Sequence, residues 1–168
     1  MIEIERYYHA DHWALLWRAY NDPLYRDFFR RTPIGLNKHD VVMELEKSIN
    51  TKFFIVHDED KIIGIVSISG ECPYSLSCYI GVMIFEEYQK QRQLIPIIFK
   101  ICEIIFENTN FCKVKLRVLE SNERLNRVIR EAGLRLEGEY LNEYKQTQTE
   151  LEYCIIRADY EGHKGKIV

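Results

Sequence analysis

The sequence predicts one α/β domain over residues 1–168, with a mixed sheet that carries helices on both faces. Strand-like and helix-like apolar periodicities alternate along the chain in the order β-α-α-β-β-β-α-β-α-β-β. A mostly apolar helical segment at 94–108 joins two strand segments, which predicts a right-handed βαβ crossover. The 168 residues, 46% of them hydrophobic, suffice for one core, and no repeat or linker divides them.

The first half of the chain holds two expected helices and four expected strands. Ile2 and Ile4 alternate with acids, which is typical of a short strand. Asp11 can cap a helix in which Leu16 and Trp17 share the apolar face. The expected elements are a strand within 1–8, a helix from 11 to 20, a helix from 37 or 40 to about 49, and strands at 53–57, 61–69 and 76–85.

A polar segment at 86–93 leads into the apolar helix at 94–108. Lys100, Glu103 and Glu107 form only a narrow polar stripe on that helix, so we expect most of its surface to be buried. The helix is too short and too charged to cross a bilayer.

The strand expected at 111–119 has one apolar and one basic face, and the basic face carries Lys113, Lys115 and Arg117. In the last expected strand, at 148–157, Glu150 and Glu152 share a face. We expect these strands to be antiparallel neighbours with the acids opposite the cations, a cross-strand ladder favoured over a nucleic-acid-binding patch. Between them, the pattern predicts a helix at 122–132, closed by Gly133, and a strand near 134–140.

The composition excludes several classes of protein. The 23 basic and 26 acidic residues give a net charge of -3, which provides no general attraction to nucleic acid or to an anionic membrane. The five cysteines and five histidines lack metal-ligand spacing, so we expect buried, reduced thiols and no metal. No apolar run reaches the ~20 residues of a membrane span, and the acidic start is unlike a signal peptide. We expect a cytoplasmic protein.

Four segments, taken in order, resemble the GNAT superfamily of N-acetyltransferases, and within it the branch of ribosomal-protein N-terminal acetyltransferases. They are AYNDPLYRDFF, KFFIVHDEDKIIGIVSI, SNERLNRVIREAGLRLEGEY and ELEYCII. The resemblance covers nearly the whole chain and implies a GNAT-type mixed, mostly antiparallel sheet. It also implies acetyl-CoA as co-substrate, an amine acceptor such as a protein N-terminus or a small polyamine-like molecule, and a homo-oligomer as one form of assembly.

In that family, a loop of the form Gln/Arg-x-x-Gly-x-Gly/Ala cradles the cofactor's pyrophosphate with backbone N–H groups at a helix N-terminus. Here Arg92 and Leu94 stand where the small residues would be. Either Lys90 and Arg92 bind phosphate through their side chains, or the loop is a solvated segment of a fold that no longer binds coenzyme A. The cofactor contacts that the resemblance implies are Met83, Ile84, Gln89, Lys90, Gln91, Arg92, Gln93, Leu94 and Asn122.

The catalytic groups are fewer than the family pattern would supply. The family often places a hydroxyl donor for the leaving thiolate at positions that are Leu125 and Ile129 here. Glu71 is the candidate base, because it ends the strand bordering the expected acceptor cleft. Asn122 can bind the pantetheine arm or simply cap its helix. Tyrosines that could line an acceptor groove, or merely reflect strand propensity, are Tyr79, Tyr88, Tyr140 and Tyr144.

Two functions therefore stay open. The first is acetyl-CoA-dependent N-acyl transfer to a primary amine. The second is a GNAT-fold binding or assembly protein that has lost catalysis.

Overall fold

The computed structural model describes residues 1–21, 37, 39–40, 43, 50–89, 93–144 and 148–163, with the backbone alone at 9–10, 20, 143–144 and 163. Its helices are α1 (His9–Asn21), the short 3-10 helix η1 (Glu86–Tyr88), α4 (Leu94–Asn108), α5 (Glu123–Glu131) and α6 (Arg157–His163). Its strands are β1 (Ile2–Arg6), β2 (Lys52–Asp58), β3 (Lys61–Cys72), β4 (Ser77–Ile84), β5 (Lys113–Leu119), β6 (Arg135–Tyr144) and β7 (Gln148–Ile156).

The strands form one seven-stranded sheet in the order β1-β2-β3-β4-β5-β7-β6. Every pairing is antiparallel except that of β4 with β5, which α4 connects as a crossover. This confirms the expected fold class, a mixed and mostly antiparallel sheet. The hand of the crossover stays a prediction.

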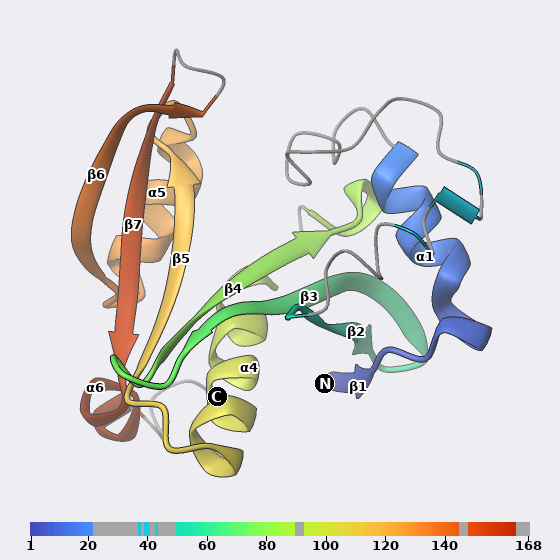
Figure 1. Cartoon of the computed structure of the whole chain (residues 1–168), viewed down its shortest axis with the longest axis horizontal. Coiled ribbons are helices and arrows are strands. Elements are labelled where there is room, and N and C mark those ends of the chain that lie inside the picture. The colour runs from blue at the N-terminus through green and yellow to red at the C-terminus, as the bar shows by residue number, and fades with distance from the viewer. Residues whose placement is uncertain are drawn as a thin grey trace.

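Helices cover both faces of the arm formed by β1–β4, as Figure 1 shows, with α1 on one face and α4 on the other. The larger core cluster lies under α4, whose residues Ile97, Ile101 and Cys102 are fully buried. The smaller cluster lies under α1 and includes Leu16 and Met83. The apolar pattern of the chain predicts both clusters, because each element buries one stripe of side chains.

Two details of α1 differ from the expectation. The helix begins at His9, so Asp11 lies in its first turn instead of capping it. Trp17 is 42% exposed, while Ala19 is fully buried beside Leu16. The angular position of a residue around the helix axis decides whether its side chain faces the core. Ala19 lies at a core-facing position and is buried, although the larger and more apolar Trp17 was expected to face the core.

The second expected helix lies mostly outside the described residues, including its segment 41–42 and 44–49. His39 and Asp40 are helical. The side-chain oxygen of Asn37 accepts a hydrogen bond from the Asp40 N–H at 3.1 Å, and the Asp40 carboxylate accepts one from the Asn37 N–H at 2.9 Å. This reciprocal pair is the geometry of a capping box.

Strands β5 and β7 are antiparallel neighbours, as the sequence predicts. Arg117 on β5 lies directly opposite Glu152 on β7, which confirms the predicted antiparallel ladder. Cations of β5 bind Glu150 and Glu152 across the strands, so this face is not an uncompensated basic patch. The sequence pattern did not predict α6, where the backbone turns directly from β7 into a helix at Arg157, or the short helix η1 within the polar segment.

Three of the five thiols are buried, at Cys78, Cys102 and Cys154, and all five cysteines are free. Burial raises the pKa of the Cys78 thiol to about 12, so this thiol stays protonated and behaves as an apolar core group. Cys112 is exposed, contrary to the expectation of burial. None of the helices in the described residues is both long enough and apolar enough to cross a membrane.

Candidate active site

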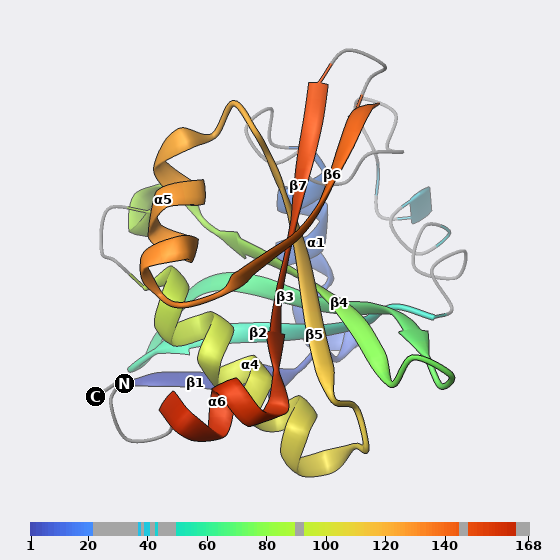
Figure 2. The same cartoon turned by 90° about the vertical axis from the view of Figure 1, so that its left-hand side faces the viewer.

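The sheet opens between β4 and β5. Only Ser77, Cys78 and Tyr79 of β4 pair with β5, although both strands continue beyond these positions. Figure 1 shows the result, two arms that diverge from the start of β5, and Figure 2 shows that the strands of the two arms run in crossing directions. Because the separated strand edges no longer pair with each other, a cleft forms between the arms, and two cavities lie along it.

The first cavity has a volume of about 460 Å³ and lies between β3–β4 and β5. Its walls are mostly apolar. The polar side chains that reach it are Ser67, Ser69, Tyr79 and Arg117. Leu125 and Ile129 also line it, so the two positions where the family resemblance would place a hydroxyl donor do face the cleft, and neither carries one.

The second cavity has a volume of about 810 Å³ and lies between β4, the start of α4 and one face of α5. It is the more polar of the two in its side chains, which include Gln89, Gln93, Asn122, Arg124, Arg127 and Glu131. Val82, Met83, Leu94 and Leu125 line both cavities. The cavities therefore adjoin near the C-terminal end of β4 and lie next to each other along the cleft.

The backbone of β4 offers hydrogen-bonding groups to the cleft. The Phe85 N–H donates to the Ile63 carbonyl of β3 at 2.9 Å. Backbone directions alternate along a strand, so Met83 also bonds toward β3, while the N–H groups of Val82 and Ile84 point away from β3 into the cleft. The Gln89 amide donates to the Ile84 carbonyl at 3.2 Å, which confirms that direction. Sequence reasoning selected Met83 and Ile84 but not Val82. Val82 could have been selected as well, because residues two apart in a strand, such as Val82 and Ile84, direct their backbone groups to the same side.

Gly64 lets β3 approach this part of β4 closely. A Cβ at position 64 would lie 2.2 Å from the Met83 carbonyl oxygen, far inside van der Waals contact. The glycine of the isoleucine-glycine pair at 63–64 is therefore required sterically, because no side chain fits between β3 and β4 at this position.

The side chains predicted to hold the cofactor are only partly brought together. Gln89, Gln93, Leu94 and Asn122 all line the second cavity. Gln93 is buried, and its amide donates to the Asp58 carboxylate at 2.5 Å. Lys90, Gln91 and Arg92 lie outside the described residues.

Asn122 caps α5: its side-chain oxygen accepts from the Leu125 N–H at 3.2 Å. A buried network that sequence reasoning missed supports this helix start. Asn126 donates to the carbonyls of Leu119, Glu120 and Asn122, and accepts from the Tyr153 hydroxyl at 3.0 Å. The β5–α5 loop is therefore fixed to β7, and Asn122 is held at the mouth of the second cavity. The Asn122–Asn126 spacing was a usable signal, because i and i+4 share a helix face.

Glu71 lies at the end of β3 and binds the Lys52 ammonium at 2.6 Å. It lines neither cavity. Its role as a catalytic base stays a prediction.

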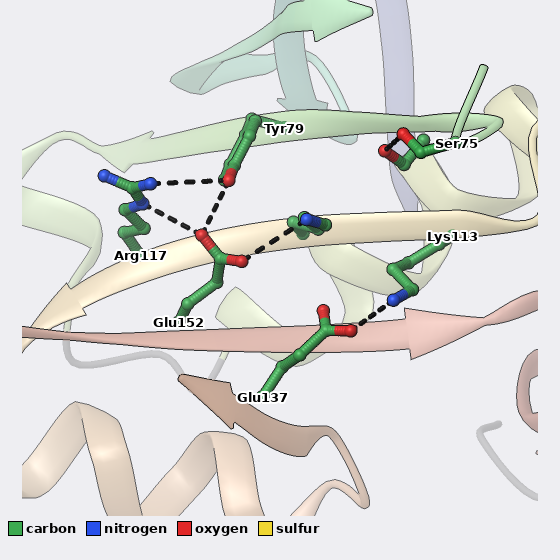
Figure 3. Close-up of polar contacts among 8 residues, drawn as sticks. Ser75, Tyr79, Lys113, Arg117, Glu137 and Glu152 are labelled. Atoms are coloured by element: carbon green, nitrogen blue, oxygen red, sulfur yellow. Dashed lines mark hydrogen bonds and ion pairs between the residues drawn. The ribbon is translucent and has the colours of Figure 1, made fainter. Parts of the chain in front are cut away.

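One wall of the first cavity carries a partly buried ion-pair network, drawn in Figure 3. The Tyr79 hydroxyl donates to Glu152 Oε2 at 2.6 Å, and Arg117 Nε donates to the same oxygen at 3.0 Å. Lys115 lies 3.4 Å from the other carboxylate oxygen. The guanidinium of Arg117 stacks on the Tyr140 ring at 3.9 Å. Two of the predicted groove tyrosines therefore meet at this wall.

The charges of this network are coupled. Burial raises the pKa of Glu152, but hydrogen bonds from Tyr79 and Arg117 outweigh it and hold the pKa below its ordinary value. Burial and the bond to Glu152 together raise the pKa of Tyr79. Near neutral pH the wall therefore presents a protonated phenol and an ionised carboxylate, and it balances that carboxylate with two cations.

The remaining tyrosines lie elsewhere or are not described. Tyr88 packs against the core clusters from η1, and the side chain of Tyr144 lies outside the described residues. Within the described part of the chain, no group of three or more His, Cys, Asp or Glu side chains could hold a metal ion.

Comparison with solved structures places this fold. The spermidine N-acetyltransferase from Vibrio cholerae, crystallised with CoA and spermine, matches with a TM-score of 0.85 and 17% identity, over 95% of this chain and 98% of that one. A dodecameric structure of spermidine N-acetyltransferase from the same organism matches with a TM-score of 0.77 and 15% identity, over 95% of each chain. No protein-family model matches the sequence. The curated proteins contain no match either. The chain has the GNAT fold, with a cleft at the point where that fold separates its two arms.

Proposed function

We propose that the protein transfers the acetyl group of acetyl-CoA to a primary amine, with the cofactor in the second cavity and the acceptor in the first. The observation that carries this proposal is the early end of the β4–β5 pairing at Tyr79, which leaves the edge of β4 facing two adjoining cavities. A thioester bound along β4 and an amine entering from the other side would meet at the residues shared by the two cavities.

The pantetheine arm fits the exposed edge of β4. An amide-containing chain can pair with backbone groups that face the cleft, as an added strand does. Asn122 would contact this arm at the mouth of the second cavity. The full set of cofactor contacts that we propose is Val82, Met83, Ile84, Gln89, Lys90, Gln91, Arg92, Gln93, Leu94 and Asn122.

The chemistry needs little from the protein beyond positioning. The neutral amine attacks the thioester carbonyl, the C–N bond forms and the C–S bond breaks. The thiol, with an ordinary pKa of about 8.5, leaves as a thiolate and takes a proton from water. The raised pKa of Tyr79 keeps its hydroxyl protonated, so its oxygen can orient the amine but cannot serve as the base. Glu71 binds Lys52 and lines neither cavity, so we propose that it would act as the base only through water that carries the amine proton away.

The acceptor is a small amine or a protein N-terminus. The structural neighbour crystallised with spermine favours a polyamine-like acceptor. The resemblance of four sequence segments favours the ribosomal-protein branch and hence a protein N-terminus. The charge-balanced wall at Glu152 does not by itself select a polycation, because two cations already bind that carboxylate.

A binding or assembly protein without catalysis is the second candidate. Leu125 and Ile129 favour it, because they place apolar side chains where a hydroxyl donor would assist the leaving thiolate. We also propose a homo-oligomer, supported by the dodecameric neighbour, and a cytoplasmic location, where the five cysteines would stay reduced.

The proposed function is tested by measuring both the binding of acetyl-CoA and the release of its thiol. Calorimetric titration with acetyl-CoA is expected to show one site per chain, and thiol release is expected when spermidine or a peptide with a free α-amine is added. Faster release with one acceptor identifies the acceptor class. Binding without release from a broad amine panel supports the non-catalytic protein, and no binding rejects the proposed function.

A further inference from the structure

We propose that Arg124 and Arg127 of α5 bind the phosphates of coenzyme A, on the wall of the second cavity that faces the start of α4. This inference rests on the proposed function, because it assigns a phosphate-binding role within the same cleft. It locates the phosphate contacts on a different element from the loop at 89–94.

The first observation is the placement of the two side chains. Arg124 and Arg127 are three residues apart, so they lie on one face of α5, and both line the second cavity. The opposite wall carries Gln89 and Gln93, which flank the polar loop. A ligand in this cavity would therefore lie between Gln89 and Gln93 on one side and the two guanidinium groups on the other.

The second observation is the electrostatic setting of Arg124. It lies in the first turn of α5, where the partial positive charge of the helix N-terminus opposes a cation. It makes no ion pair within the described part of the chain, and the loop residues Lys90, Gln91 and Arg92 include no acid that could supply one. No acid among the described residues therefore stabilises the charge of Arg124, whereas an anion bound in the cavity would.

The third observation concerns Arg127. Its only ion pair among the described residues joins Nε to Glu131 at 3.9 Å, and both side chains are about 70% exposed, at 72% and 69%. Such a pair is weak. Glu131 lines the same cavity, so a bound phosphate would compete with it for Arg127.

The loop sequence explains why this wall would be needed. Arg92 and Leu94 replace the small residues that let a backbone approach a pyrophosphate closely. Guanidinium groups can bind phosphate oxygens in pairs from a greater distance, because the side chains are long and each offers several donors. Binding through side chains at an exposed site depends strongly on salt, unlike binding in a backbone cradle.

The experiment measures binding and does not need turnover. Calorimetric titrations with CoA and, separately, with inorganic pyrophosphate are made on the parent protein and on the double variant Arg124→Gln and Arg127→Gln. Glutamine keeps the helix propensity. Arg6→Gln on β1 is the matched control, because it removes the same charge from an exposed residue that lines neither cavity.

We expect the double variant to bind both ligands more weakly, by roughly tenfold for CoA, and with a flatter dependence on salt. Arg6→Gln is expected to bind as the parent does. Glu131→Gln is expected to bind CoA more tightly, because it removes the competing acid. Dephospho-CoA identifies which phosphate is held: equal weakening indicates the diphosphate, and weakening confined to CoA indicates the 3′-phosphate.

The results separate this inference from the proposed function. Parent-like CoA affinity in the double variant, or equal weakening in Arg6→Gln, overturns the phosphate assignment and leaves the proposed function standing. Pyrophosphate binding that needs the two arginines, in a protein that does not bind CoA, supports the phosphate site and rejects the function. A protein that binds neither ligand rejects both.

Discussion

The Tyr79 hydroxyl donates a 2.6 Å hydrogen bond to Glu152 and so joins the last paired residue of β4 to β7, across β5. The bond lies where the two arms of the sheet separate. It connects a residue that lines the first cavity to a carboxylate that is only 2% exposed. The wall of the cleft is therefore held by side chains at the point where the backbone ladder ends.

Removing this hydroxyl should weaken the fold. Tyr79→Phe is expected to lower the free energy of unfolding by about 1–2 kcal/mol, because the buried carboxylate loses one of its donors. Urea unfolding measures it, and Tyr74→Phe is the control, since Tyr74 is 99% exposed. A double-mutant cycle with Glu152→Gln should show that the two effects are not additive. Additive effects would mean that the hydrogen bond contributes nothing.

Stability should fall in acid through Glu152. Its folded-state pKa lies below the ordinary value of 4.5, so the stabilisation is present above about pH 4.5 and is lost as pH falls through the folded-state pKa. Glu152→Gln should flatten this part of the curve of unfolding free energy against pH. Glu87 has a pKa lowered by its bond to Arg18, so some slope should persist. Parallel curves for parent and variant would contradict the assignment.

Gly64 should be essential to the shape of the cleft. Gly64→Ala is expected to cost about 1–3 kcal/mol of stability and to weaken acetyl-CoA binding, because the new methyl group would push the Met83 carbonyl and shift β4. Gly162→Ala is the matched control, since a Cβ there meets nothing within 4 Å. Unchanged binding in Gly64→Ala would show that the cofactor does not depend on this part of β4.

A hydroxyl at position 125 should assist the leaving thiolate. Leu125 lines both cavities, and a missing general acid typically costs ~10²–10⁴ in rate. We expect slow turnover in the parent that rises with pH as the amine loses its proton, and faster turnover in Leu125→Ser. Glu71→Gln should change the rate little if water carries the proton.

A fast parent enzyme that Leu125→Ser leaves unchanged would mean that the acid lies elsewhere in the cleft. Inactivity of both forms toward a broad amine panel would favour the non-catalytic protein.

The sequence predicted the fold well because its patterns are strong. The buried helix α4, the two-faced strand β5 and the acids of β7 each carry a clear periodicity, and each lies as expected. The prediction that Trp17 faces the core was wrong, and helix α6 was not predicted. The face of α1 is decided by packing against β2–β4, and α6 is a short polar helix with little apolar periodicity.

The site was harder to predict, because it is formed by residues distant in the sequence. No local sequence pattern marks the residue at which the β4–β5 pairing ends. No local pattern marks the contact between Tyr79 and Glu152 either, because these residues are 73 positions apart in the sequence. Asn122 was selected because the family resemblance assigns it to the pantetheine arm, and its alternative role as a helix cap is local. Arg124 and Arg127 were not selected, since a charged helix face normally indicates only exposure to solvent.

Binding of the cofactor along β4 is tested most directly by amide hydrogen exchange, resolved by residue with NMR, with and without acetyl-CoA. The Val82 N–H points into the cleft, and the Met83 N–H points toward β3. If acetyl-CoA binds along β4, it should slow exchange at Val82 and leave the already protected Met83 nearly unchanged. Exchange at Val82 that is the same with saturating acetyl-CoA as without it would contradict binding of the cofactor along β4.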